Sequence, residues 1–240
     1  MQRLRSFGPF LAACIAVSVI PGSTTAERRR LHPVVSTDSV ITLPAGSVIA
    51  AEGDSITYGQ DASASGGRPP INDGVLGRSI SPFPETLAVR LQRCPVVNRG
   101  YPGDRSVEGL VRWQDASPTD LTVLMFGTND AMNRPLGAQG PVNVQTFRFT
   151  LTELIERRRR AGSHVVLITP PPIAYPELNA LIDPYREEVQ AIGERMGLLV
   201  VDAGEALQDV ETILAPDGVH LSPEANRELA DTLATVLRCG

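Results

Sequence analysis

The sequence predicts an α/β protein in which five parallel strands form a sheet between two layers of helices, a three-layer α/β/α sandwich. Short apolar runs rich in β-branched residues alternate with stretches that carry apolar residues at helical spacing. Each run has the length of a strand buried on both faces, which is typical of parallel sheets. The expected strands are Val48–Ala51, Pro95–Asn98, Leu121–Phe126, Val165–Ile168 and Leu198–Val201. Right-handed crossovers would place helices on both faces.

Two helices have readable ends. Asp183 is expected to cap a helix that starts at Pro184 and stops at Gly197, since proline is favoured at the first helical position and glycine just past the last. Another helix is expected to begin at Ser222-Pro223 and to bury apolar residues as far as Val236 or Leu237. Both carry an apolar stripe at helical spacing, which predicts packing against the sheet.

A further helix is expected to open at Gly140-Pro141 and to end in the arginine run Arg157–Arg160, just before Gly162. One interpretation of the run is a basic binding patch. We prefer a simpler one, in which four solvated cations complement the negative end of the helix dipole.

Composition limits the function classes. The chain has 240 residues, 42% hydrophobic and 20% charged, with a formal net charge of −5. These values are typical of one globular domain, and we therefore look for a single functional site. They disfavour a disordered chain and a polycationic nucleic-acid binder.

The first 26 residues have the organisation of a secretory signal peptide. Arg3 and Arg5 precede an apolar run from Phe7 to Ile20, and the small residues Ser23-Thr24-Thr25-Ala26 offer a cleavage site. We therefore expect an exported protein, periplasmic or secreted.

The mature chain would begin near Glu27, with residues 27–44 as a linker and residues 45–240 as the one folded domain. Two alternatives stay open, a retained membrane anchor and a lipoprotein modified at Cys14, which lies in a short lipobox-like sequence. No other stretch is long and apolar enough to span a bilayer, so we expect no stable membrane span after processing.

A serine follows the first expected strand directly, in Gly53-Asp54-Ser55. In parallel sheets the functional site lies beyond the carboxyl ends of the strands. A serine at the start of a helical turn there is surrounded by backbone N–H groups that can stabilise an anion. Taken alone, the motif also fits an ordinary turn.

An acid and a histidine lie three residues apart before the last helix, in Asp217-Gly218-Val219-His220. The chain has three histidines; His32 falls in the linker and His164 opens a strand, so His220 is the candidate general base. Asp217 would hold its tautomer and stabilise the imidazolium.

Two further loops follow the second and third expected strands, at Asn98–Gly103 and Gly127–Asp130. Gly100 could bring a bare backbone N–H to an oxyanion, and Asn129 could add a side-chain amide. Acyl transfer needs such donors where negative charge develops.

Together these four blocks resemble those of the SGNH (GDSL) hydrolases, over roughly Val48 to Leu237. The resemblance implies an SGNH/flavodoxin-like fold with Ser55 as nucleophile and with His220 and Asp217 as base and orienting acid. It also implies an oxyanion hole made of the Ser55 and Gly100 N–H groups and the Asn129 side chain.

Two features depart from the family pattern. Glu52 stands directly before Gly53, where the family more often has an apolar residue, and its partner is not evident. The long loop Asp61–Pro82 elaborates the usual short path into the first helix. It weakens any analogy of substrate.

The implied chemistry is two-step ester hydrolysis through an acyl-enzyme. We expect no metal or organic cofactor, because the sequence has no Cys/His cluster with metal-ligand spacing, no dinucleotide fingerprint and no Walker motif. The favoured substrates are short acyl esters, including carbohydrate O-acetyl groups. A lysophospholipase or thioesterase and an O-acyltransferase stay open as alternatives. A non-catalytic carbohydrate-binding protein is a rival of another class, disfavoured by the low aromatic content of 5%.

Cys94 and Cys239 are the cysteines that remain once the leader with Cys14 is removed. An even pair in an oxidising compartment favours a disulfide. Cys94 precedes the second strand and Cys239 follows the last helix, so both are expected at the edge of the sheet opposite the active site. Two free thiols are the alternative.

Overall fold

The computed structural model describes residues 40–61, 77–132 and 141–240, all within the compact unit Pro33–Gly240. The expected signal peptide, residues 27–39 of the expected linker and most of the Asp61–Pro82 loop lie outside the described residues. Within those ranges, no helix combines the length and the apolarity needed to cross a membrane.

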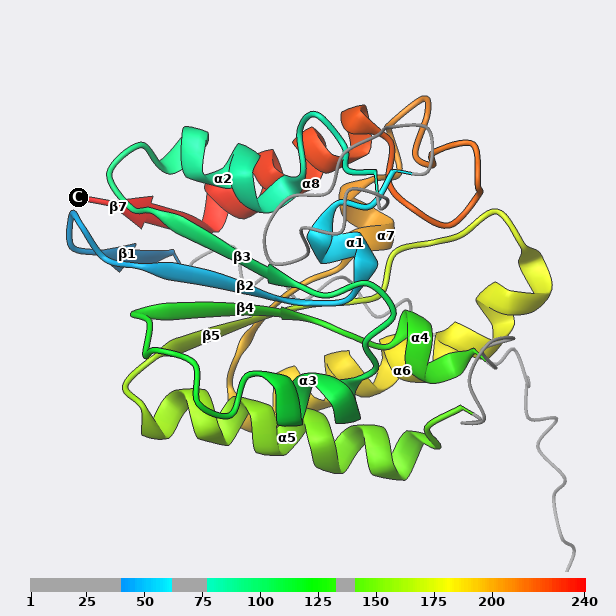
Figure 1. The fold of residues 1–240 in the computed structure, drawn as a ribbon, viewed down its shortest axis with the longest axis horizontal. Coiled ribbons are helices and arrows are strands. Elements are labelled where there is room, and N and C mark those ends of the chain that lie inside the picture. The colour runs from blue at the N-terminus through cyan, green and yellow to red at the C-terminus, as the bar shows by residue number, and fades with distance from the viewer. Residues whose placement is uncertain (1–39, 62–76, 133–140) are drawn as a thin grey trace, which may run out of the picture. The chain divides into compact units, whose positions relative to one another are not determined.

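The five expected strands form one parallel sheet in the order β3-β2-β4-β5-β6 (Figure 1). Its strands are β2 (Ile49–Gly53), β3 (Val96–Gly100), β4 (Leu121–Met125), β5 (His164–Ile168) and β6 (Leu199–Val201). Each lies within two residues of its expected bounds. In the register of the central strands Gly53 pairs with Gly100 and Met125, so three chain segments leave the sheet side by side at its carboxyl edge.

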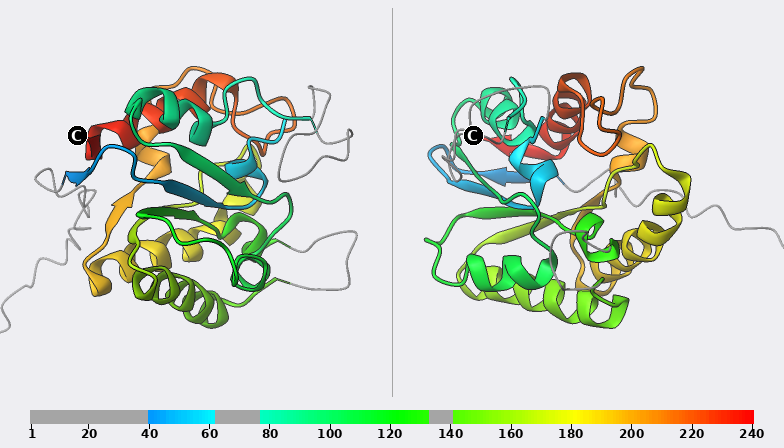
Figure 2. Two further views of the ribbon diagram at one scale, coloured as in Figure 1. Left: turned by 60° about the vertical axis from the view of Figure 1, so that its left-hand side comes forward. Right: turned by 45° about the vertical axis from the view of Figure 1, so that its right-hand side comes forward.

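Helices cover both faces of the sheet, which confirms the expected three layers (Figures 1 and 2). One face carries α2 (Phe83–Leu91) and α8 (Pro223–Val236), and the other carries α3 (Ser106–Arg112), α5 (Val144–Arg160) and α6 (Pro176–Met196). A separate apolar core lies on each side of the sheet. The loops that carry the polar motifs follow the carboxyl ends of the strands, beyond the two apolar cores.

Two helix starts differ from those expected. Helix α6 begins at Pro176 rather than Pro184, which lies inside the helix. Ile182, on the extra turns, is fully buried, and this burial compensates for the hydrogen bond that the inner proline removes. Helix α5 begins at Val144 because the Asn143 side chain accepts the N–H of Thr146 and caps it. Gly197 ends α6 in the left-handed conformation, as expected.

A small second sheet joins the two ends of the described chain. Strand β1 (Ile41–Leu43) pairs in parallel with β7 (Leu237–Cys239). The expectation of a linker over residues 27–44 is therefore wrong at Ile41–Leu43, where the apolar Leu43 packs into the core.

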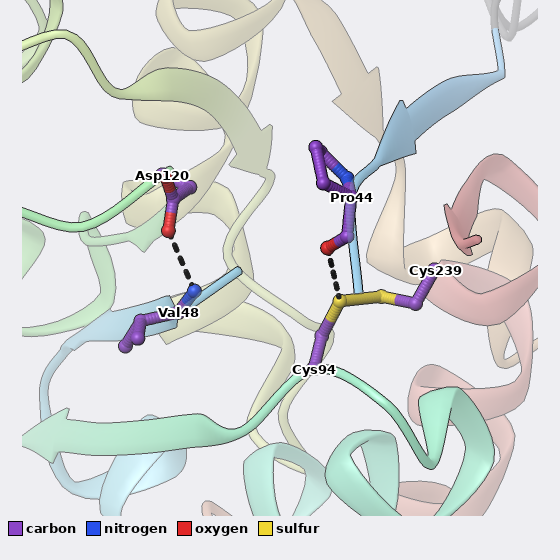
Figure 3. Close-up of a disulfide and its surroundings, with 5 residues drawn as sticks. All are labelled: Pro44, Val48, Cys94, Asp120 and Cys239. Atoms are coloured by element: carbon purple, nitrogen blue, oxygen red, sulfur yellow. Dashed lines mark hydrogen bonds between the residues drawn. A yellow bond between two sulfur atoms is a disulfide. The ribbon is translucent and has the colours of Figure 1, made fainter. Parts of the chain in front are cut away.

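Cys94 and Cys239 form a disulfide with Cα atoms 6.1 Å apart, which answers the question left open by the sequence (Figure 3). The carbonyl oxygen of Pro44 lies 3.6 Å from Cys94 Sγ. Nearby, the Asp120 carboxylate accepts the N–H of Val48 at 2.7 Å at the start of β2. The bond thus lies where the parallel strands begin, at the edge opposite Ser55.

Candidate active site

The turn after β2 is shaped by close packing and by a cap. Gly53 is required there because a Cβ atom would lie 2.2 Å from Thr57 Oγ1 and 2.5 Å from the carbonyl oxygen of Met125. The Asp54 carboxylate accepts the N–H of Ile56 at 2.8 Å and caps α1 (Ser55–Tyr58). Ser55 is consequently the first residue of a short helix at the carboxyl edge of the sheet.

Ser55, His220 and Asp217 lie in one chain of hydrogen bonds. His220 Nε2 is 2.8 Å from Ser55 Oγ, and His220 Nδ1 is 2.7 Å from Asp217 Oδ2. Ser55 and His220 are buried, whereas Asp217 is partly exposed. The expected base and orienting acid are thus both within hydrogen-bonding distance of the groups they would serve.

The three-residue spacing of Asp217 and His220 has a local cause. Asp217 Oδ1 accepts the backbone N–H groups of Val219 and His220, each at 2.9 Å, and Oδ2 faces the imidazole. Burial raises the pKa of Asp217, but these hydrogen bonds lower it by more, so the pKa lies below its ordinary value. The carboxylate therefore stays ionised beside His220 at neutral pH.

The expectation of a bare N–H at Gly100 is wrong. That N–H donates to the side-chain oxygen of Asn98 at 2.9 Å. A Cβ at Gly100 would lie 2.1 Å from the backbone nitrogen of Tyr58, so the glycine is needed for packing between β3 and α1. The position is explained by space and by a local hydrogen bond.

Asn129 and Gly103, in the neighbouring loops, differ from Gly100 in their hydrogen bonding. Asn129, in α4 (Thr128–Ala131), donates one amide N–H to the carbonyl of Asp104 at 3.0 Å. Its second N–H has no acceptor in the described part of the chain. Gly103 has φ +83°, and none of the described residues accepts its N–H. In the sequence, Pro102-Gly103 is typical of a turn, and this dipeptide is the feature that could have indicated Gly103.

Comparison with known proteins decides the family. A profile of the GDSL-like lipase/acylhydrolase family matches residues 51–228, most of the chain. The chain belongs to this family. Like its relatives, this GDSL-like protein is a serine ester hydrolase.

Three relatives show how far the likeness extends. A GDSL esterase/lipase of Arabidopsis thaliana is 26% identical over 183 residues, which cover 61% of this chain and 74% of that protein. Axe2, an acetylxylan esterase from Geobacillus stearothermophilus, has a similar structure with a TM-score of 0.64 at 25% identity, covering 82% of this chain and 96% of Axe2. LAE5, an α/β hydrolase from the metagenome of Lake Arreo, Spain, gives a TM-score of 0.63 at 27% identity, covering 80% and 96%.

Two buried acidic residues, Asp54 and Asp130, lie in the segments that form the site of this GDSL-like hydrolase. Burial raises the pKa of Asp54 to about 7, and the charges of Asp130 and Asp104 add to the effect. Burial also raises the pKa of Asp130 to about 6, although hydrogen bonds from Ser106 oppose the rise. Asp130 accepts the N–H of Ser106 at 3.0 Å and its hydroxyl at 2.6 Å. These bonds attach the start of α3 to the helix that carries Asn129.

Glu52 finds its partners in two buried arginines. Arg99 Nη1 lies 3.0 Å from Glu52 Oε1, and Arg158 Nε and Nη2 lie 3.1 and 3.0 Å from Oε2. The expectation that all of Arg157–Arg160 are solvated is wrong for Arg158, which is 4% exposed because it turns inward to this carboxylate. Arg159 and Arg160 are exposed, as expected.

Proposed function

We propose that Ser55, His220 and Asp217 are the catalytic triad of an esterase that removes short acyl groups, acetyl above all, from carbohydrate hydroxyls. The unbroken series of hydrogen bonds from Asp217 through His220 to Ser55, at 2.7 and 2.8 Å, carries this proposal. A nucleophile, a base in contact with it and an acid that orients the base form the minimal machinery for acyl transfer.

The reaction proceeds in two halves. Ser55 Oγ attacks the ester carbonyl carbon while His220 Nε2 takes its proton, and an oxyanion forms. When the oxyanion collapses, the bond to the alcohol oxygen breaks and the protonated His220 delivers its proton to the departing alkoxide. Water then attacks the acyl-enzyme, giving a proton to His220. The acid leaves as Ser55 regains its proton.

The oxyanion would be held by the backbone N–H of Ser55 and the side chain of Asn129, with Gly103 in place of Gly100. The second amide N–H of Asn129 and the N–H of Gly103 support this choice because the described residues leave both without an acceptor. The bond from Asn129 to the Asp104 carbonyl keeps the two donors close, since Asp104 follows Gly103 directly. Hydrogen-bond donors that are already in position do not have to reorient when the oxyanion forms, so they stabilise it more strongly.

The resemblance to Axe2 supports an acetylated carbohydrate as substrate, because that protein is an acetylxylan esterase. Nitrophenyl acetate, butyrate, octanoate and laurate would define the acyl preference, and acetylated xylan would test the alcohol. We expect kcat/KM to be highest for acetate or butyrate and acetate release from the polysaccharide. A maximum at octanoate or laurate, without release from xylan, would instead favour a lipid substrate.

Covalent labelling tests the proposed nucleophile. Diethyl nitrophenyl phosphate should add one diethylphosphoryl group per chain, at Ser55, in step with the loss of hydrolysis. The same treatment of His220→Ala should leave the serine almost unmodified, because no base activates it. Inactivation with the label on another residue would contradict the assignment.

We further propose that the protein is exported. The basic start, apolar run and small-residue site support it, and a disulfide between Cys94 and Cys239 is typical of an oxidising compartment. Sequencing the amino terminus of protein from the producing cell should find a start near Glu27. A chain that begins at Met1 in the cytosol would contradict export, and a lipidated Cys14 would show the lipoprotein variant.

A further inference from the structure

We propose that the ring of Tyr175 is the stacking platform of a saccharide subsite on the leaving-group side of Ser55. The inference rests on the proposed function and adds the position at which the sugar is held. It concerns the segment between β5 and α6, whose residues contact the Asp217–His220 loop.

Tyr175 borders the loop that carries the acid and the base. Its hydroxyl donates to the carbonyl oxygen of Asp217 at 3.1 Å, and the N–H of Ala174 donates to the carbonyl of Gly218 at 2.8 Å. The ring also lies against Gly218, where a Cβ atom would be 3.2 Å from a ring carbon. The aromatic side chain is thus a neighbour of the triad loop.

The proposed mechanism indicates which part of the substrate lies beside the Asp217–His220 loop. His220 must hand a proton to the departing oxygen, so the alcohol has to lie beside His220 when the ester bond breaks. In the proposed oxyanion hole the carbonyl oxygen faces Asn129 in α4, not His220. We therefore expect a group that borders the Asp217–His220 loop to contact the alcohol rather than the acyl chain.

The ring is both accessible and fixed. Tyr175 is 46% exposed. Asn179 holds the preceding loop by accepting the N–H of Ile173 at 3.1 Å, and its own N–H donates to the Tyr175 carbonyl at 2.9 Å. Arg186 adds bonds to the carbonyls of Pro170 and Pro171 at 2.8 and 2.7 Å. A platform ordered in advance loses little entropy when a ligand binds.

An exposed tyrosine in this place suits a sugar. Its ring offers an apolar face with a polar tip, and a pyranose offers a face of C–H groups surrounded by hydroxyls. A small alkyl alcohol such as methanol is too short to cover such a surface, whereas an oligosaccharide can. Phe149 is another exposed aromatic side chain, but it lies within α5, outside the segment that borders the Asp217–His220 loop, so it serves as the matched control.

Three variants, Tyr175→Ala, Tyr175→Phe and Phe149→Ala, separate stacking from support of Asp217. We expect Tyr175→Ala to lower kcat/KM for acetylated xylo-oligosaccharide by about tenfold, mainly through KM, and to affect methyl acetate by less than about threefold. Tyr175→Phe, which keeps the ring and loses the hydroxyl, should retain most of the activity on the oligosaccharide, and Phe149→Ala should behave like the parent. Equal losses on both substrates in Tyr175→Phe and Tyr175→Ala would overturn the proposal, because the hydroxyl would then act only on the Asp217 loop.

A binding measurement keeps this result independent of catalysis. NMR titration with unacetylated xylo-oligosaccharide should show contact with the parent and with Ser55→Ala, and the contact should be lost in Tyr175→Ala. Binding that is unchanged in Tyr175→Ala would overturn the subsite even if the esterase proposal holds. A parent that binds through Tyr175 but hydrolyses no ester would contradict the proposed function and leave the subsite supported.

Discussion

The carboxylate of Glu52 and the guanidinium of Arg158 form a buried ion pair directly beneath the turn that carries Ser55, with Nε and Nη2 at 3.1 and 3.0 Å from Oε2. Arg99 binds the other carboxylate oxygen, so one anion holds two cations from different elements. The network connects β2, which leads to Ser55, with β3 and the last turn of α5. Removing one member leaves an uncompensated charge in the interior.

Replacing Arg158 by Met should therefore lower the free energy of unfolding by about 3–5 kcal/mol, because Glu52 loses half of its compensation. Chemical denaturation of parent and variant would measure the change. Arg160→Met, an exposed position in the same turn, is the control and should stay within about 0.5 kcal/mol. Similar losses of unfolding free energy in both variants would contradict a specific stabilising role for the buried Glu52–Arg158 pair.

The disulfide gives a second prediction. It joins residues 145 positions apart. The chain-entropy account then predicts that replacing both Cys94 and Cys239 by Ala lowers the free energy of unfolding by at most about 4–5 kcal/mol. The kcat for phenyl acetate at low temperature should stay close to the parental value, since the bond lies at the edge opposite Ser55.

Alkylation of the unfolded, unreduced protein checks the bond itself. Cys94 and Cys239 should remain unmodified without reductant and should both react after reduction. Two alkylated cysteines in the unreduced sample would contradict the disulfide.

A third prediction concerns pH. Burial raises the pKa of Asp54 from 3.8 to about 7, so between these values the folded protein holds a proton that the unfolded chain has released. The free energy of unfolding should consequently fall as the pH rises from about 4 to about 7. Asp54→Asn, which keeps an oxygen to accept the N–H of Ile56, should make this fall shallower. Asp130, with a pKa of about 6, would supply the remainder.

Denaturation curves across this pH range would measure the slope for the parent, Asp54→Asn and the exposed control Asp115→Asn. The control should keep the parental slope. If Asp54→Asn keeps it too, the raised pKa of Asp54 is contradicted.

Much of the fold, and the contact between Asp217 and His220, could be predicted because the relevant signals are local. Five apolar runs of strand length indicate the sheet, and parallel strands necessarily bring the loops after them to one edge. Asp217 lies three residues from His220, so a single turn accounts for their contact. The apolar stripe of α8 continues to Val236 and places the chain end near Cys94.

What could not be predicted depends on tertiary packing. Arg158 lies 106 residues from Glu52, and nothing in a run of four arginines says which one turns inward. Gly100 and Gly103 follow the same strand, and only the folded structure shows that the Asn98 side chain accepts the N–H of Gly100. In the sequence, Pro184 fits the first position of a helix. Helix α6 begins earlier, at Pro176, and Ile182 in this first part is buried in the core, which the sequence alone does not show.

The fourth prediction tests the oxyanion donors. Asn129→Ala should lower kcat for phenyl acetate by about 10²–10³, as expected for the loss of one donor to the developing charge. Asn143→Ala, which removes the cap of α5, is the control and should cost about 1 kcal/mol of stability without a comparable loss of kcat. Steady-state kinetics well below the unfolding temperature would separate the two effects. Unchanged turnover in Asn129→Ala would remove this residue from the hole.

The central claim is that Ser55, activated by His220, forms the acyl-enzyme. Turnover of nitrophenyl acetate by folded Ser55→Ala, compared with the parent and with His220→Ala, tests it most directly. We expect kcat to fall by at least about 10⁴ in both variants, and the double variant to lose little more, because the residues act as one unit. A Ser55→Ala protein that keeps turnover near the parental value would contradict the assignment of Ser55 as the nucleophile.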